Sequence, residues 1–299
     1  MRGRSALAST PVVREGPWPG PPDRRIDDTN LGRYFYEVRD TKSGERLYSR
    51  GYASIYGEWE TTAEAQERRR GFHESVRFPE PTGPVTVTIK KRDARGAFQP
   101  AWSVKLDPAD PAIDRRPLAA VQVWAVVKNG EPADKVDLLL LGDGYTAAEM
   151  EKWHRDARRL ADTLFAVSPF KEHRAAFNVW AADTPSADSG VSRPSDGVYR
   201  RTALGATYDA FGSERYVLSF DNERMRDAAA AAPYEFIEIA VNDRLQPPCG
   251  QVGAFEGAMY EARGYYRPQT DCIMFTRDEV GFCAVCRRAI DRVIALYAR

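Results

Sequence analysis

The spacing of hydrophobic residues divides this chain of 299 residues into two parts. From Leu31 to about Pro108, apolar and polar residues alternate, as they do from Tyr34 to Val38 and from Val85 to Ile89. Alternation with a period of two is typical of strands that bury one face, and turn sequences separate the alternating runs. The pattern predicts an antiparallel β-sandwich domain over residues 31–117, with one short helix within Thr61–Arg70.

Beyond a proline-rich linker, the pattern becomes one of strands that alternate with helices. The run Val136–Leu141 is almost continuously apolar, which is typical of a strand covered on both faces. Thr146 and Glu149 then match a capping box, which predicts that a helix begins there. This alternation predicts a largely parallel sheet in an α/β domain over residues 118–299. Further strands are expected at Phe177–Ala182 and Tyr234–Val241, and further helices at Asn222–Ala231 and Phe282–Tyr297.

Composition and charge narrow the class of protein. Hydrophobic residues make up 43% and charged residues 29%, as in a globular protein. Lys and Arg together number 43, as do Asp and Glu, so no global charge favours nucleic acid or an anionic membrane as a partner. No window reaches the ~20 apolar residues of a membrane helix. Residues 1–30 are rich in Pro, Gly and Arg and are expected to form a flexible lead-in, and Met1–Arg14 has no apolar run typical of a signal peptide.

The four cysteines all lie in the last quarter of the chain, at Cys249, Cys272, Cys283 and Cys286. This clustering indicates one local structural feature and not a framework of disulfides. Three arrangements are open for Cys272, Cys283 and Cys286. They could form a thiolate zinc site on the Cys-x-x-Cys spacing, a disulfide between Cys272 and one of the other two in an exported protein, or buried thiols otherwise.

Several segments in a fixed order carry a resemblance to one family. They are Tyr48–Trp59, Phe72–Pro79, Leu141–Thr146, Thr184–Val191, Val252–Ala258, Gly264–Pro268, Asp271–Phe275 and Phe282–Cys286. Together they resemble the IgA-peptidase family of secreted bacterial zinc metallopeptidases, from about residue 30 onward. The resemblance implies an N-terminal β-sandwich followed by a zincin-like (metzincin-like) α/β domain that hydrolyses peptide bonds of protein substrates with zinc. It also implies export, although the sequence gives no location. Within Asp271–Phe275, the residues Cys272, Ile273 and Met274 resemble the Met-turn, the apolar floor beneath the zinc in such enzymes.

One segment of the family is missing from the sequence. The zinc helix of such peptidases carries His-Glu-x-x-His, with two histidines one helical turn apart and a glutamate that acts as general base. The only histidines here are His73, His154 and His173, and none has a second histidine four residues away. In the family, the zinc helix follows the strand that ends near Asn242, whereas here residues 244–251 lead directly to the next family segment. We therefore predict an apparent deletion near 244–251, for which a natural deletion, a frameshift and a gap in gene assembly are open explanations. We also predict no catalytic residue, no zinc ligand and no zinc-dependent proteolysis.

Two carboxylates and one surface remain as candidate sites. Asp143 and Glu256 could face the cleft of a complete enzyme, although a role in a tight turn is the simpler explanation for Asp143 between two glycines. The alternative to an inactive peptidase is a non-catalytic protein that binds a protein or glycan through aromatic residues of the sandwich. Those aromatic residues are Tyr48, Tyr52, Tyr56 and Trp59. Loss of the zinc helix is also expected to expose apolar residues of the strands at Leu138–Leu141 and Phe236–Val241.

Overall fold

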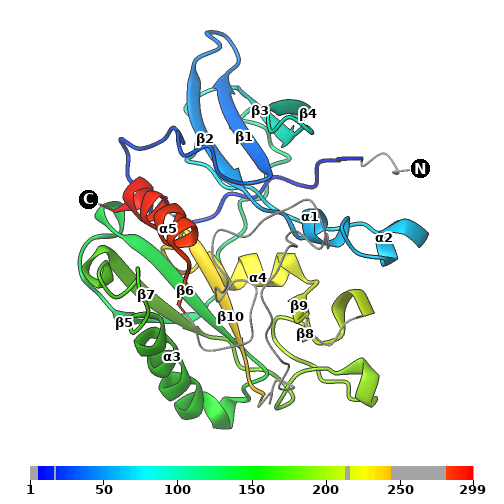
Figure 1. The fold of residues 1–299 in the computed structure, drawn as a ribbon, viewed down its shortest axis with the longest axis vertical. Helices are drawn as coiled ribbons and strands as arrows, with labels where there is room; N and C mark the ends of the chain where they lie inside the picture. Colours follow the sequence, from blue (N-terminus) through cyan, green and yellow to red (C-terminus); the bar gives the residue numbers. More distant parts are fainter. Residues whose placement is uncertain (1–5, 17, 213–215, 244–280, 299) are drawn as a thin grey trace.

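The first half of the chain folds around one antiparallel sheet of four strands (Figure 1). The computed structural model describes residues 6–16, 18–212, 216–243 and 281–298. Along the sheet the strands follow the order β2-β1-β3-β4, so that β1 and β3 are central and β2 and β4 are edges. Their bounds are β1 Tyr34–Asp40, β2 Arg46–Tyr52, β3 Val85–Arg92 and β4 Phe98–Leu106.

The alternation of the sequence gives this sheet one apolar face. Tyr36, Val38, Val87 and Ile89 are buried on this face. The cover comes from the short helix α1 Ile55–Trp59, which supplies Tyr56, and from extended chain, which supplies Trp18, Val76 and Phe78. A second short helix, α2 Glu64–Glu67, follows α1. The prediction of a sandwich is therefore wrong for the described residues, where 31–117 form a single sheet. Strand alternation shows that a face is buried, but it does not show whether strands or irregular chain cover it.

The second half contains a mixed sheet in the order β10-β6-β7-β5. Strands β6, β7 and β10 are parallel, as predicted, and β5 pairs antiparallel with β7. The strands are β5 Gln122–Val127, β6 Val136–Asp143, β7 Phe177–Asp183 and β10 Phe236–Val241, with a small pair β8 Ala206–Thr207 and β9 Leu218–Ser219. The helices are α3 Met150–Leu164, α4 Asn222–Ala229 and α5 Ala284–Tyr297, with 3-10 turns at Pro132–Asp134, Ala147–Glu149, Arg174–Ala176, Pro194–Asp196 and Ala210–Gly212.

Strand β6 is buried on both faces, in agreement with its continuous apolar run. Leu138 and Leu140 face α3 and α5, whereas Leu139 and Leu141 face α4 and the chain around Leu204. The expected exposure of Leu138–Leu141 is therefore wrong, because helices and loops within the described residues cover both sides. In β10 the expectation holds at one position, because Phe236 is 38% exposed.

Helix α3 is fixed at its start by the predicted capping box. The backbone N–H and the hydroxyl of Thr146 each donate to the carboxylate of Glu149 at 2.9 Å, and the box encloses one 3-10 turn that leads directly into α3. Trp153 is fully buried, and its indole N–H donates to the carbonyl of Ala182 at 3.1 Å. A Cβ at Gly142 would approach the Trp153 ring to 2.8 Å, so the close packing of α3 on β6 requires glycine there.

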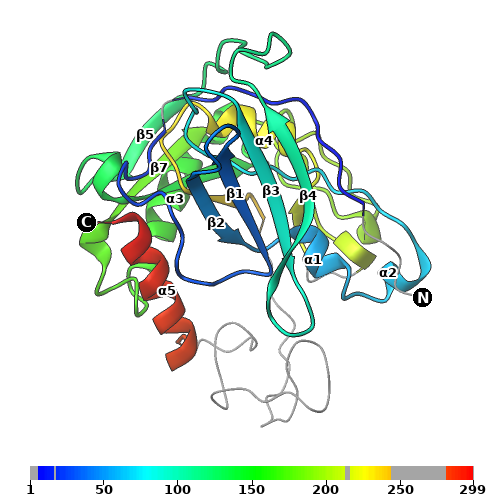
Figure 2. The same cartoon turned by 90° about the horizontal axis from the view of Figure 1, so that it is seen from above.

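The two halves meet at the last turn of α5. Arg24 donates to the carbonyl of Ala298 at 2.6 Å, and Arg50 donates to the Tyr297 hydroxyl at 3.1 Å. Arg77 donates to the carbonyl of Tyr234 at 2.7 Å and lies over its ring. Figures 1 and 2 show α5 beside the N-terminal sheet as well as on the face of the second one. Among the described residues, no helix has the length and apolar character needed to cross a membrane.

Candidate functional site

The carboxyl ends of β6, β7 and β10 form the edge of the sheet at which α/β proteins usually place function. Asp143 ends β6, is fully buried and accepts hydrogen bonds from the backbone N–H groups of Leu204 at 2.9 Å and Ala206 at 2.8 Å. Ser186 lies beside it, and its hydroxyl accepts from the N–H of Gly144 at 3.0 Å and from that of Ala203 at 2.9 Å. Because these bonds engage both groups, Asp143 and Ser186 hold the loops at this edge together.

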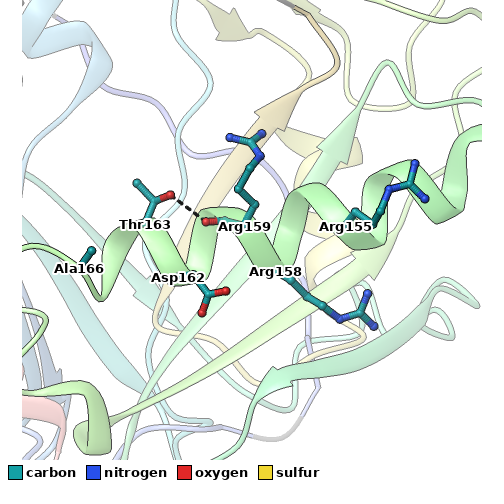
Figure 3. A pocket seen from close by; sticks show the side chains of 6 residues that line it. All are labelled: Arg155, Arg158, Arg159, Asp162, Thr163 and Ala166. Carbon is teal, nitrogen blue, oxygen red and sulfur yellow. Dashed lines mark hydrogen bonds between the residues drawn. The ribbon is translucent and has the colours of Figure 1, made fainter.

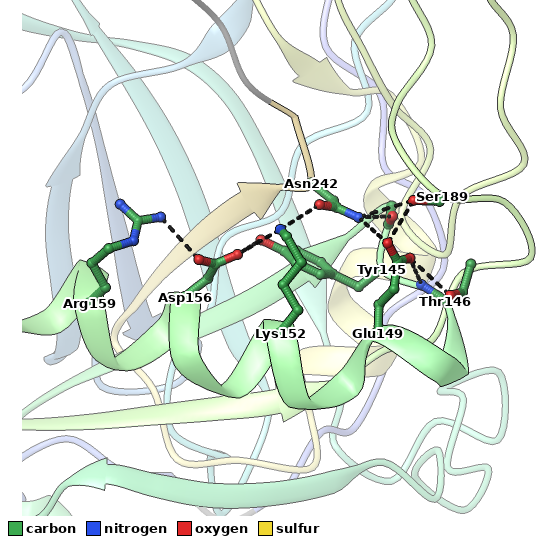
Figure 4. A network of polar contacts seen from close by, with 9 residues as sticks. Tyr145, Thr146, Glu149, Lys152, Asp156, Arg159, Ser189 and Asn242 are labelled. Carbon is green, nitrogen blue, oxygen red and sulfur yellow. Dashed lines mark hydrogen bonds and ion pairs between the residues drawn. The ribbon is translucent and has the colours of Figure 1, made fainter.

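A polar network closes the same edge around the end of β10 (Figure 4). The side-chain amide N–H of Asn242 donates to the carbonyl of Gly144 at 2.9 Å and to Glu149 at 3.3 Å. Its amide oxygen accepts from Lys152 at 2.7 Å, and Ser189 donates to Glu149 at 2.9 Å. Asn242 is thus bound from two sides, which ties the end of β10 to α3 and to the turn that precedes it.

Hydrogen bonding sets the ionisation of the two acids in this network. The backbone N–H of Thr146, with further donors from Thr146, Ser189 and Asn242, lowers the pKa of Glu149 to about 2. Partial burial raises the pKa of Asp156, but donors from Lys152, Tyr145 and Arg159 outweigh this effect and lower it. Both groups are therefore carboxylates at neutral pH, and their donors occupy them. A general acid or base would need a pKa closer to the working pH.

A second pair of acids lies at the opposite end of the same strands. Asp137, at the start of β6, is fully buried and accepts from the side chains of Asn178 at 2.9 Å and Trp180 at 2.6 Å. Glu235 precedes β10, and its carboxylate accepts from the backbone N–H of Asp137 at 2.6 Å. Burial and the nearby charge of Asp137 raise the pKa of Glu235 to about 8, although the hydrogen bond from the Asp137 N–H opposes this rise. Glu235 is therefore mainly protonated at neutral pH.

The three histidines do not fit the zinc that the family resemblance implies. His73 is an exposed residue of the N-terminal half, with Thr10 at 3.4 Å. His154 on α3 lies 2.9 Å from the Asp183 carboxylate, and His173 lies 3.1 Å from Asp291 on α5. Each ring thus faces a different part of the fold. Within the described ranges, no three His, Cys, Asp or Glu side chains form a group that could hold a metal ion.

Several predicted site residues cannot be placed. Glu256, Cys272, Ile273 and Met274 lie outside the described residues, so their roles stay predictions. Cys283 is buried at the N-cap of α5, and its sulfur accepts the backbone N–H of Cys286 at 3.5 Å. The structure thus brings the Cys-x-x-Cys pair to one helix start, without testing a partnership with Cys272.

A hollow on the outer face of α3 borders the polar network, because Arg159 lines it. Figure 3 shows Arg158 and Arg159 extending from opposite sides of the helix. Arg158 lies over the Trp124 ring, and Arg159 pairs with Asp156 at 3.2 Å. Because these guanidinium groups do not converge, the hollow presents no common point for an anion.

Two pairs of side chains in this structure were not predicted from the sequence. The four-residue spacing of Lys152 and Asp156 on a predicted helix is a signal that could have indicated an ion pair. Nothing in the sequence indicates that Asp137 and Glu235 meet, because 98 residues separate them and only the parallel pairing of β6 with β10 brings them together.

The described fold is an N-terminal β domain followed by a mixed α/β domain, with a polar network at the carboxyl edge of the second sheet. Sequence models of one family match both parts. The model of the IgA peptidase M64 domain matches residues 124–247 and 243–294, and the model of the peptidase M64 N-terminus matches residues 3–103. The chain therefore belongs to the IgA peptidase M64 family. A search of curated proteins found no match.

Proposed function

We propose that this chain is a non-hydrolysing member of the M64 peptidase family that binds protein without cleaving it. The observation that carries the proposal is the set of histidines, since zinc peptidases use three protein ligands and an open water position. Only three histidines are present, and their contacts hold them on different elements. In a complete zincin-like enzyme, zinc would activate water for attack on the peptide bond. The residues described here cannot hold it.

The family match supports an internal loss. The peptidase domain is matched as two segments that overlap at residues 243–247. A missing internal block produces such a break, and the predicted deletion lies at 244–251. Asn242, which the polar network fixes, directly precedes this break. We infer that the network anchors the end of β10 immediately before the predicted deletion.

A cleavage assay tests the proposal. The purified chain is incubated with casein and equimolar zinc, with and without 1,10-phenanthroline, beside an M64 protein that carries His-Glu-x-x-His. We expect the control to cleave casein in a chelator-sensitive way and this chain to leave it intact. Circular dichroism of the same sample establishes that the chain is folded. Chelator-sensitive cleavage by this chain, or one tightly bound zinc per chain with nitrogen ligands by X-ray absorption, would refute the proposal.

The alternative of a glycan as the bound partner has less support. Of the four aromatic residues proposed for that surface, Tyr48 and Trp59 are 3% and 5% exposed, so they belong to the core. Tyr52 and Tyr56 are half-buried and line a large groove. A protein partner agrees with the peptidase ancestry, since members of the parent family act on protein.

A further inference from the structure

The N-terminal half contains a groove that no part of the peptidase chemistry uses. It has a volume of about 2550 Å³ and is lined by residues of β3, β4, α1, α2 and the chain before β1. Its floor includes Trp102, Val104 and Leu106 of the edge strand β4, all half-buried. Pockets for small molecules usually measure roughly 300–1,000 Å³, so this groove has room for a segment of a polymer. Figure 2 shows β4 at the edge of the sheet, with α1 and α2 on the same side.

The geometry of the groove favours an extended chain. Within the described residues, β4 pairs only with β3, so its other edge faces no strand. Adding an extended peptide to such an edge is a common mode of recognition, in which alternate side chains enter pockets. Extended chain already pairs in the wall of the groove at one isolated bridge. There the backbone N–H of Arg14 donates to the carbonyl of Asp114, and the backbone N–H of Asp114 donates to that of Val12, both at 2.8 Å.

The charge of the groove favours acidic side chains on that chain. Among the side chains that line it, Lys and Arg outnumber Asp and Glu by ten to seven. Many of these bases are paired, as Arg77 is with Glu15 at 2.6 Å. Arg68 and Arg69, which follow α2, are exposed and have no carboxylate partner among the described residues. Two neighbouring unpaired guanidinium groups in a groove that also has an apolar floor suit a segment that carries both acidic and apolar residues.

We infer that this groove binds an extended acidic polypeptide, which lies along β4 with apolar side chains on Trp102, Val104 and Leu106 and with carboxylates on Arg68 and Arg69. The inference rests on the proposed function, because it names the partner class and the site of a protein that binds without cleaving. The backbone N–H and C=O groups of a peptide can form hydrogen bonds with the free edge of β4. A glycan has no such backbone. The peptide is therefore the occupant that the observations favour.

The test measures binding of fluorescein-labelled β-casein, an acidic unfolded protein, by fluorescence anisotropy in low salt. The variant Arg68→Glu/Arg69→Glu reverses the two unpaired charges. The control Arg95→Glu/Arg155→Glu makes the same change of net charge at exposed positions outside the groove. We expect the first variant to weaken binding at least tenfold and the control to stay within twofold of the unchanged chain. Hydrogen exchange should show slower exchange of the amides in residues 98–106 when casein is bound.

The outcomes separate this inference from the proposed function. Three results would overturn the inference that the groove binds a peptide. They are absence of casein binding, equal binding by both variants, and displacement of casein by maltoheptaose. The proposed lack of hydrolysis would stand in each of those cases. Conversely, gel electrophoresis of the same samples shows whether casein is cut. Chelator-sensitive cleavage together with groove-dependent binding would refute the proposed lack of hydrolysis and leave the groove as a substrate site.

Discussion

The buried acid Glu235 makes a quantitative prediction about stability and pH. Its pKa in the folded protein is about 8, against an ordinary value of 4.5. Between these two values the folded state holds a proton that the unfolded state has lost, so the free energy of unfolding falls as pH rises. Each pH unit in this window lowers the free energy of unfolding by about 1.4 kcal/mol. At pH 7 the free energy of unfolding is therefore about 3 kcal/mol lower than it would be with a permanently neutral side chain at this position. Below pH 4.5 this loss disappears.

The substitution Glu235→Gln removes this cost. Glutamine has the shape of a protonated glutamate, and its amide oxygen can still accept the backbone N–H of Asp137. One oxygen of Glu235 and one of Asp137 have no hydrogen-bond partner in the structure. The amide N–H of a glutamine is therefore accommodated better at position 235 than the negative charge of an ionised glutamate. We expect the variant to be more stable by about 3 kcal/mol at pH 7, by less than about 1 kcal/mol at pH 5 and equal at pH 4.

Urea unfolding followed by tryptophan fluorescence at pH 4, 5, 6 and 7 measures the difference. The control Glu131→Gln changes a carboxylate that is 78% exposed and should show no such dependence on pH. If the gain from Glu235→Gln is the same at pH 5 and pH 7, or if the variant is less stable at pH 7, Glu235 is ionised in the folded protein and the reasoning fails.

Three further substitutions test other parts of the structure. Trp153→Ala should lower the free energy of unfolding by about 3–5 kcal/mol by urea titration, whereas Glu151→Ala on the exposed face of α3 should change it little. Asp143→Asn should cost about 2–3 kcal/mol, because it replaces a charged acceptor of two backbone N–H groups, and limited trypsin digestion should then cut faster between residues 184 and 206. Glu149→Gln should lower the free energy of unfolding at pH 7 by no more than about 1 kcal/mol. The difference in stability between the variant and the unchanged chain should disappear as pH falls from 4.5 toward 2. An unchanged difference at pH 2.5 would contradict the role of the capping box.

Local signals predicted the fold better than they predicted the site. The continuous apolar run of β6 and the box formed by Thr146 and Glu149 each correspond to a real element, because burial and capping act over a few residues. The predicted sandwich is wrong because the cover of a sheet depends on distant chain. Asp143 could be selected as a residue of the sheet edge, but its bonds go to the backbone N–H groups of Leu204 and Ala206, a distant loop that the sequence does not indicate. The pairing of Asp137 with Glu235 depends on strand order, which single-sequence patterns do not give.

The bonds from Arg24 and Arg50 to the last turn of α5 have a consequence for biosynthesis. Both arginines are made early, yet their acceptors, at Ala298 and Tyr297, are made more than two hundred residues later. The guanidinium of Arg50 is largely sheltered from water and lies over the Tyr297 ring. While the ribosome is still translating the second half, this cation has the Tyr48 ring on one side but not yet the ring and hydroxyl of Tyr297, so that side stays hydrated. The nascent β domain therefore cannot reach its final packing until α5 leaves the exit tunnel.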